Sequence, residues 1–195
     1  MLITNEFEVT HPVDTVWAFF NDIPQVAKCL PGTELTDDLG NDTYQGRVAI
    51  RMGPVRMQFT GKAQIKERDA AARRIVVDAA GADEAGRGQA AMLLTATLSA
   101  TPRGGTRVGA SLDLQLSGAA AQFGRGMVAD VTAVLLRDFG ANLQARVDAI
   151  SRGLDPDRVG APKSASGFAI GLRALRMALG RVLRRFFLPY EPSRV

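Results

Sequence analysis

Polar and apolar positions alternate along much of the first half of the chain. The clearest run begins at Met57, where apolar or small side chains take every second position as far as Ile65. A period of two places these side chains on one face of a β-strand and leaves the other face wet. Residues 2–9 and 108–116 alternate in the same way. Turn residues separate the further strands that we expect at 33–39, 43–52, 75–80 and 90–101.

Helical spacing interrupts the strands near the N-terminus and follows them at the end. Apolar residues three and four apart after Pro12 predict a helix over 13–21, and a shorter helix is expected over 25–29. From about 120 to 150 the apolar residues cover more than half of a helix's circumference, so this helix must be buried on most sides. The expected fold class is α+β, a helix-grip in which an antiparallel sheet curves around a long C-terminal helix.

The segment 168–188 predicts an additional, amphipathic C-terminal helix. At about 100° per residue, its apolar side chains form one stripe: Phe168, Leu172, Leu175, Leu179, Val182, Leu183 and Phe186. The far side and one flank carry Arg173, Arg176, Arg181, Arg184 and Arg185, and no acidic residue lies in the segment. A helix of this kind is typical of binding to an anionic membrane surface. Docking on the protein's own body or on a partner protein are the alternatives.

Charge is distributed unevenly between the body and this tail. The whole chain carries a formal charge of +4, of which residues 163–195 contribute +6, so residues 1–162 carry −2. A nearly neutral body argues against a nucleic-acid partner. Five arginines within residues 168–188, and the lack of an apolar run of about 18 residues anywhere, argue against a membrane-spanning helix. We therefore expect a peripheral protein at the cytoplasmic face of the membrane, because the N-terminus also lacks the pattern of a signal peptide.

Catalytic chemistry has few candidates in this sequence. His11 is the sole histidine and Cys29 the sole cysteine, so neither a metal cluster nor an intrachain disulfide is expected. We interpret His11 as a turn residue and Cys29 as a small buried side chain. Trp17 is expected to be a core residue or, alternatively, a residue at the entrance of the cavity. The protein is thus predicted not to be an enzyme.

A cavity between the sheet and the long helix is the candidate binding site. Small residues at strand positions expected to face the helix leave room that a packed core would fill with larger ones. The full set of expected lining residues is Val48, Ile50, Phe59, Gly61, Ala63, Ala79, Ala91, Leu112, Leu114, Phe123, Met127, Val131, Val134 and Leu135. Such a lining suits an apolar ligand. Each of these residues taken alone is more often plain core, whereas for the set as a whole a pocket lining and a plain core are about equally expected.

Three stretches of the chain resemble a known family. Residues 12–34 (PVDTVWAFFNDIPQVAKCLPGTE), residues 46–69 (GRVAIRMGPVRMQFTGKAQIKERD) and the long helix with Asp130 and Phe139-Gly140 are similar to CoxG, the G subunit of aerobic carbon monoxide dehydrogenase. This family is a branch of the START-like, Bet v 1-like (SRPBCC) superfamily, and the resemblance covers residues 1 to about 150. It implies a START-like ligand-binding domain at 1–153. The composition of the residues that follow predicts a flexible linker (154–167), and the basic helix (168–188) and a short tail (189–195) come after it.

The resemblance also implies a function. It indicates an accessory protein that supports the contact of a molybdenum-containing carbon monoxide dehydrogenase with the membrane. We expect the cavity to hold a quinone, either menaquinone or ubiquinone, and to carry it between membrane and enzyme. A membrane anchor without ligand carriage, a small enzyme of the same superfold and an assembly factor are the rival interpretations. The tip at Gly53-Pro54 is a candidate contact with the dehydrogenase.

Overall fold

The structure, a computed structural model, describes residues 1–158, so the expected tail helix and residues 159–167 of the expected linker lie outside the described residues. Within this range the chain forms one antiparallel sheet of seven strands in the order β1-β7-β6-β5-β4-β3-β2. The strands are β1 (Leu2–Val9), β2 (Thr33–Gly40), β3 (Thr43–Met52), β4 (Val55–Asp69), β5 (Arg74–Asp83), β6 (Gln89–Ala100) and β7 (Thr106–Leu116). The helices are α1 (Val13–Phe20), α2 (Ile23–Cys29), the 3-10 helix η1 (Gly118–Gln122) and α3 (Arg125–Ser151).

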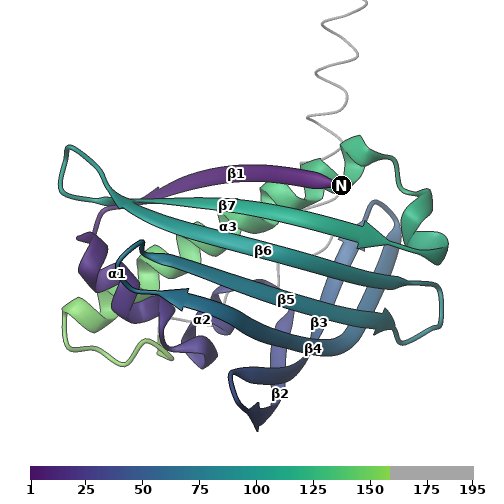
Figure 1. Ribbon diagram of the computed structural model, residues 1–195, viewed down its shortest axis with the longest axis horizontal. Helices are drawn as coiled ribbons and strands as arrows, with labels where there is room; N and C mark the ends of the chain where they lie inside the picture. The colour runs from purple at the N-terminus through teal and green to yellow at the C-terminus, as the bar shows by residue number, and fades with distance from the viewer. Residues whose placement is uncertain (159–195) are drawn as a thin grey trace, which may run out of the picture.

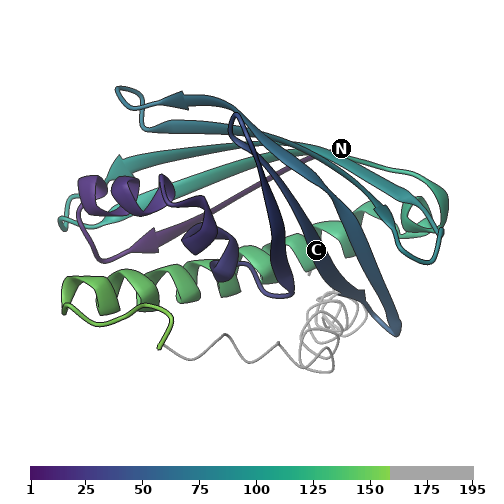
Figure 2. The ribbon, with the colours of Figure 1, turned by 90° about the horizontal axis from the view of Figure 1, so that it is seen from below.

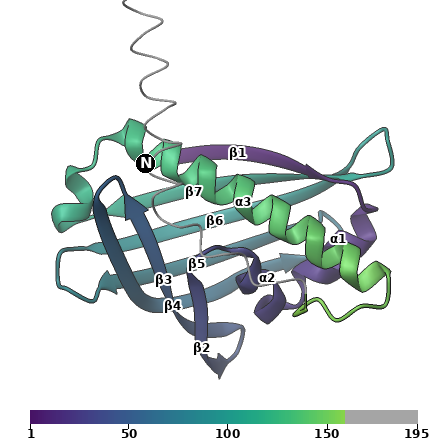
Figure 3. The ribbon, with the colours of Figure 1, turned by 180° about the vertical axis from the view of Figure 1, so that it is seen from behind.

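The helices α1, α2 and α3 lie on one face of the sheet, whose outer face is open to the viewer in Figure 1. Figure 2 shows the sheet arching over α3, with β3 and β4 curving down beside the helix. From behind, α3 runs between β1 on one side and α2 on the other (Figure 3). These layers confirm the helix-grip arrangement that the sequence predicts.

Tight turns explain why successive strands pair as neighbours. The turn from β2 to β3 uses Gly40, Asn41 and Asp42, all at positive φ, a conformation that glycine and short polar residues adopt at little cost. The turn from β3 to β4 consists of Gly53 and Pro54, with Gly53 at a φ of 62°. Glycine with a positive φ at the first central position is typical of a type II′ turn in a two-residue hairpin.

The long helix begins later than the sequence predicts. We expected it from about residue 120, but residues 118–122 form η1, and Phe123 is extended before α3 begins at Arg125. The Ala119 amide donates to the Arg87 carbonyl at 2.6 Å, and Ala120 is fully buried. Tertiary contacts with the end of the β5–β6 hairpin therefore override the helical propensity of the alanines.

The main core lies at the end of the molecule where α1 and α2 meet the last turns of α3. Trp17 and Phe20 of α1 pack there with Leu143 and Val147 of α3. The Trp17 side chain is 7% exposed, and the Arg73 guanidinium lies 5.6 Å from its ring centre. Trp17 is therefore a core residue, the first of the two roles expected for it.

The chain is held to the body beyond the end of α3. Asp157 accepts hydrogen bonds from Lys28 of α2 at 2.7 and 2.8 Å and from Arg146 of α3 at 3.1 Å. These bonds lower the pKa of Asp157, first through Lys28 and then through Arg146. Asp157, in the first part of the segment expected to be a flexible linker, is thus tied to both helices.

Candidate functional site

The inner face of the sheet, which faces α3, carries most of the residues expected to line a cavity. Phe7 marks this face because its ring meets the Phe139 ring of α3 edge-on, with centroids 5.8 Å apart. Strand pairing extends the face from Ile3 on β1 to Leu112 on β7 and Leu94 on β6. The expected lining residues that share this face by register are Val48, Ile50, Phe59, Gly61, Ala63, Ala79, Leu112 and Leu114.

The expected residues on and before the long helix have varied surroundings. Val131 and Val134 are buried, and Leu135 is half-buried. Phe123 packs against a second, smaller core cluster of Met57, Phe59 and Ala120. Met127 is 42% exposed, so it lies at the surface near the start of α3 and not inside the fold.

Ala91 lies on the outer face, so the expectation that it faces α3 is wrong. It pairs with Ala80 of β5 and is exposed, whereas its neighbour Met92 points inward. Residues 90–98 are largely apolar at both odd and even positions, so the sequence does not show which alternate side chains face inward. For the same reason Leu94, a half-buried inner residue of β6, was not predicted from the sequence.

Gly61 shares the expected face, but it does not serve to leave room for a ligand. Gly46, Gly61 and Gly81 form one row across β3, β4 and β5. A Cβ on Gly61 would lie 2.1 Å from the Ala80 carbonyl oxygen and 2.5 Å from the Gly81 Cα. The missing side chain therefore makes room for the adjacent backbone, as glycines do where a sheet bends tightly.

Two packed clusters flank the centre of the inner face. The main core includes Ile65, Ile75 and Leu98, and the second cluster includes Met57 and Phe59. The inner-face residues that belong to neither cluster and remain half-buried are Val48, Ile50, Ala63, Ala79, Met92, Leu94, Leu112 and Leu114. Apolar side chains that face a helix and yet keep contact with solvent are not packed as in a closed core.

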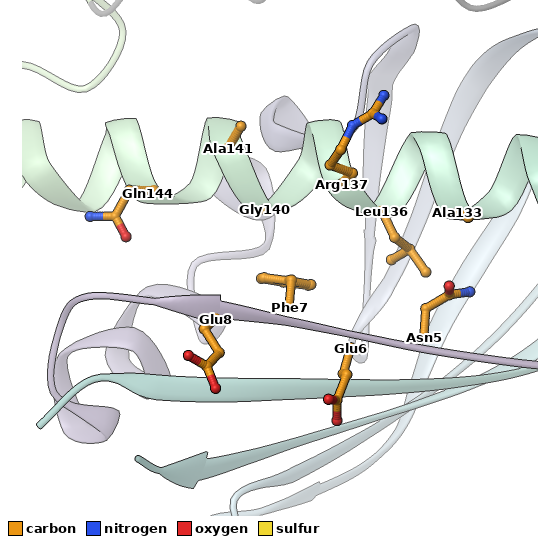
Figure 4. Close-up of a pocket in the computed structure, with 10 residues that line it drawn as sticks. All are labelled: Asn5, Glu6, Phe7, Glu8, Ala133, Leu136, Arg137, Gly140, Ala141 and Gln144. Carbon is orange, nitrogen blue, oxygen red and sulfur yellow. The ribbon is translucent and has the colours of Figure 1, made fainter. Parts of the chain in front are cut away.

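A separate groove lies between the edge strand β1 and α3, with a volume of about 360 Å³. Its lining residues are Asn5, Glu6, Phe7, Glu8, Ala133, Leu136, Arg137, Gly140, Ala141 and Gln144. Figure 4 shows Phe7 between strand and helix, with Glu6 and Glu8 projecting from the strand away from the helix. A Cβ on Gly140 would lie 2.8 Å from the Phe7 ring, so the glycine lets β1 and α3 approach closely. The groove was not predicted from the sequence, because it depends on how an edge strand meets a helix.

The titratable groups of the body have structural roles. Burial raises the pKa of the Cys29 thiol to about 12, which keeps it protonated and poorly nucleophilic. His11 Nε2 lies 2.5 Å from Asp148 Oδ1 and ties the end of β1 to α3. Within residues 1–158, no group of three or more His, Cys, Asp and Glu side chains is placed to hold a metal ion.

Asp83 is the most deeply buried carboxylate of this part of the chain. It accepts hydrogen bonds from Arg87 Nε at 2.7 Å, Arg87 Nη2 at 2.8 Å and the Gln58 amide at 3.1 Å. The bonds from Arg87 above all hold the pKa of Asp83 well below its usual range. Asp83 thus braces the β5–β6 hairpin as a permanent anion.

The membrane-binding prediction falls on the tail. The side chains expected to contact the membrane, Phe168 to Phe186, lie outside the described residues. No helix within residues 1–158 is both long and apolar enough to cross a bilayer.

Comparisons with solved structures show where this fold recurs. A conserved protein of Geobacillus kaustophilus matches with a TM-score of 0.68 and 19% identity, covering 76% of this chain and 95% of that one. A protein of Thermus thermophilus matches with a TM-score of 0.56 and 16% identity over 77% of this chain and 99% of that one. The Zhui aromatase/cyclase of Streptomyces sp. R1128 matches with a TM-score of 0.56 and 14% identity over 78% and 96%. At these identities the likeness concerns the helix-grip fold alone.

Sequence comparison identifies the family. No curated protein matches the chain. The model of the CoxG family, the G subunit of carbon monoxide dehydrogenase, matches residues 6–148, from the middle of β1 to the last turns of α3. Because this match spans most of the chain, the protein belongs to the CoxG family of carbon monoxide dehydrogenase subunits.

Proposed function

We propose that this protein binds a quinone on the inner face of its sheet and carries it between an anionic membrane surface and carbon monoxide dehydrogenase. Family membership supports the association with the dehydrogenase, of which CoxG is an accessory part. The proposed role is not catalytic, since Cys29 is a buried, protonated thiol and His11 is engaged by Asp148. Menaquinone and ubiquinone both fit the proposal, because each carries a long apolar isoprenoid chain on its quinone ring.

The observation that carries this proposal is the half-buried state of the central inner face. Ala63, Ala79, Leu112 and Leu114 face α3 but remain accessible. Covering each accessible apolar surface with a ligand gains about 25 cal/mol per Å² removed from water. An isoprenoid chain is flexible and wholly apolar, so it suits a surface of this kind.

The redox chemistry explains why a carrier would be useful. Oxidation of carbon monoxide by water to carbon dioxide releases an electron pair and two protons, and reduction of a quinone to its quinol consumes the same. The dehydrogenase would perform the oxidation, whereas quinones with isoprenoid chains stay in the bilayer. A protein that shields the chain from water while it presents the quinone ring would connect the two.

A membrane step would begin at the C-terminal segment. The pattern of arginines opposite leucines and phenylalanines over 168–188 supports binding to anionic lipid. Each arginine near such a surface contributes about 1 kcal/mol of attraction, which salt weakens. The rival function is an anchor that recruits the dehydrogenase without carrying a ligand. It would require the same tail but would not require an accessible inner face.

Quinone extraction from vesicles tests the proposal. The full-length protein is mixed with phosphatidylglycerol-containing vesicles that are loaded with menaquinone. High salt then releases the protein from the vesicles. The quinone in the protein fraction is measured by mass spectrometry. We expect close to one quinone per protein chain. A protein fraction free of quinone, although the protein had bound the vesicles, would support the anchor function and overturn the carrier proposal.

A further inference from the structure

We propose that, in the absence of a membrane, the apolar stripe of residues 168–188 docks into the groove between β1 and α3. The tail would then exchange between the protein's own body and an anionic bilayer, both of which bind the same leucines and phenylalanines. This inference concerns the resting state of the tail and goes beyond the proposed carriage of quinone.

The floor of the groove matches an apolar stripe. Phe7, Ala133, Leu136 and Ala141 line it, and the Phe7 ring occupies the space that a side chain on Gly140 would need. Gln144 stands at one end, where its amide nitrogen donates to Thr10 and Asp148. A groove of about 360 Å³ with such a floor can receive the larger side chains of a helix that lies along it.

The charges on the strand wall favour an arginine-rich occupant. Glu6 and Glu8 project from β1 on the side away from α3, so they lie at the outer rim of the groove. Arg107 donates a hydrogen bond to Glu8 at 3.0 Å and also interacts electrostatically with Glu6, so one positive charge faces two negative ones. On the helix wall, Arg137 lies 3.3 Å from Asp138, so its charge is largely compensated. An amphipathic helix in the groove would bring Arg176, at the flank of its apolar stripe, toward one rim. The net negative charge of Glu6, Glu8 and Arg107 at this rim then provides the attraction.

The point where the chain leaves the body puts the groove within reach. Asp157 is fixed to Lys28 and Arg146, and Arg146 lies on α3 just beyond the groove residue Gln144. The groove is on the β1 side of α3 and Lys28 is on the α2 side, so the chain has to pass around one helix, which is about 10–12 Å across. Residues 159–167 span up to about 30 Å when extended. The connection is therefore long enough without displacing any element.

Distances between spin labels in the full-length protein test the proposal. One pair joins Ala174→Cys, on the polar side of the predicted tail helix, to Thr4→Cys on β1 next to the groove. The control pair joins Ala174→Cys to Lys66→Cys on the outer face of β4, and Cys29 is buried and does not compete for label. Without vesicles we expect a narrow, short distribution for the first pair and a longer one for the control. Phosphatidylglycerol-containing vesicles should broaden and lengthen the first distribution.

Two results would overturn the proposal. One is a broad distribution from position 4 without vesicles, equal in width to the distribution with vesicles. The other is a narrow distribution that disappears when labelled protein is diluted into unlabelled protein, which would mean that the tail docks on a second copy. Neither result bears on quinone extraction, so failure here is distinguishable from failure of the proposed function.

A groove-filling variant provides a second readout. Ala141→Gln places a larger polar side chain in the groove, and Ala121→Gln on η1 is the matched control at another exposed alanine. Loss of the docked state should tighten binding to phosphatidylglycerol-containing vesicles by about threefold or more for Ala141→Gln, because apparent affinity scales with the fraction of free tails. Equal affinities for both variants and the unmodified protein would argue against docking.

Discussion

Gly61 on β4 lies directly opposite Gly81 on β5, and a Cβ on Gly61 would come within 2.1 Å of the neighbouring Ala80 carbonyl oxygen. With Gly46 on β3 these glycines form a row across the sheet, close to the region where β3 and β4 curve beside α3 (Figure 2). The shape of the inner face therefore depends on backbone contacts that tolerate no side chain.

Gly61→Ala should destabilise the protein by about 1–3 kcal/mol, the usual cost of forcing extra atoms into a packed site. Gly126→Ala is the matched control, since a Cβ there meets nothing within 4 Å and the residue lies in α3. The control should be neutral or slightly stabilising. Urea denaturation followed by circular dichroism measures both, and equal midpoints for the two variants would contradict the close approach.

Ala63→Leu should weaken quinone retention several-fold while the protein remains folded, because the added side chain occupies accessible space on the inner face. Ala91→Leu makes the same change on the outer face and should leave retention unchanged. Retention is measured as quinone per protein after extraction from vesicles. If the two leucines lowered retention equally, the ligand would not sit on the inner face.

The contrast between these two alanines shows what the sequence could predict. Alternation in β4 and β7 assigned the inner face correctly, because one parity is polar in each strand. In β6 the residues at 90–98 are apolar at both odd and even positions, so the pairing with β5 is needed to show that Ala91 faces outward and Met92 inward. The groove beside Phe7 and the start of α3 after η1 depend on contacts between distant segments, which periodicity does not report.

The stability contributed by Asp83 should depend on pH. Arg87 above all holds the folded-state pKa of Asp83 well below the unfolded-state pKa of about 3.9. The contribution of Asp83 to the free energy of unfolding is therefore complete above the unfolded-state pKa. This contribution is lost as the pH falls through the folded-state pKa. Asp83→Asn should therefore lower the Tm at pH 7, and the gap to the unmodified protein should narrow below about pH 4. Glu84→Gln, at the exposed neighbour, is the control and should show a much smaller gap. A gap for Asp83→Asn that stayed constant from pH 7 to pH 3 would argue against a paired carboxylate.

Asp157 should matter mainly through Arg146, whose side chain is only 5% exposed. Among residues 1–158, Asp157→Ala leaves this buried guanidinium with its hydrogen bond to Gln25 at 2.7 Å and without its carboxylate partner, so the Tm should fall. In an Arg146→Met background the same change should lower the Tm less, because no buried charge is stranded. A thermal double-mutant cycle measures the difference, and strictly additive effects would show that the two residues are not coupled.

If the protein carries quinone to the dehydrogenase, its inner face must bind the quinone. If it only recruits the enzyme to the membrane, the inner face need not bind any ligand. The most direct test is carbon monoxide-dependent reduction of menaquinone in phosphatidylglycerol-containing vesicles by purified dehydrogenase, followed optically. We predict that the unmodified protein and Ala91→Leu accelerate reduction, and that Ala63→Leu does so much less although it recruits the enzyme to vesicles equally well. Full acceleration by Ala63→Leu, or none by the unmodified protein, would contradict carriage.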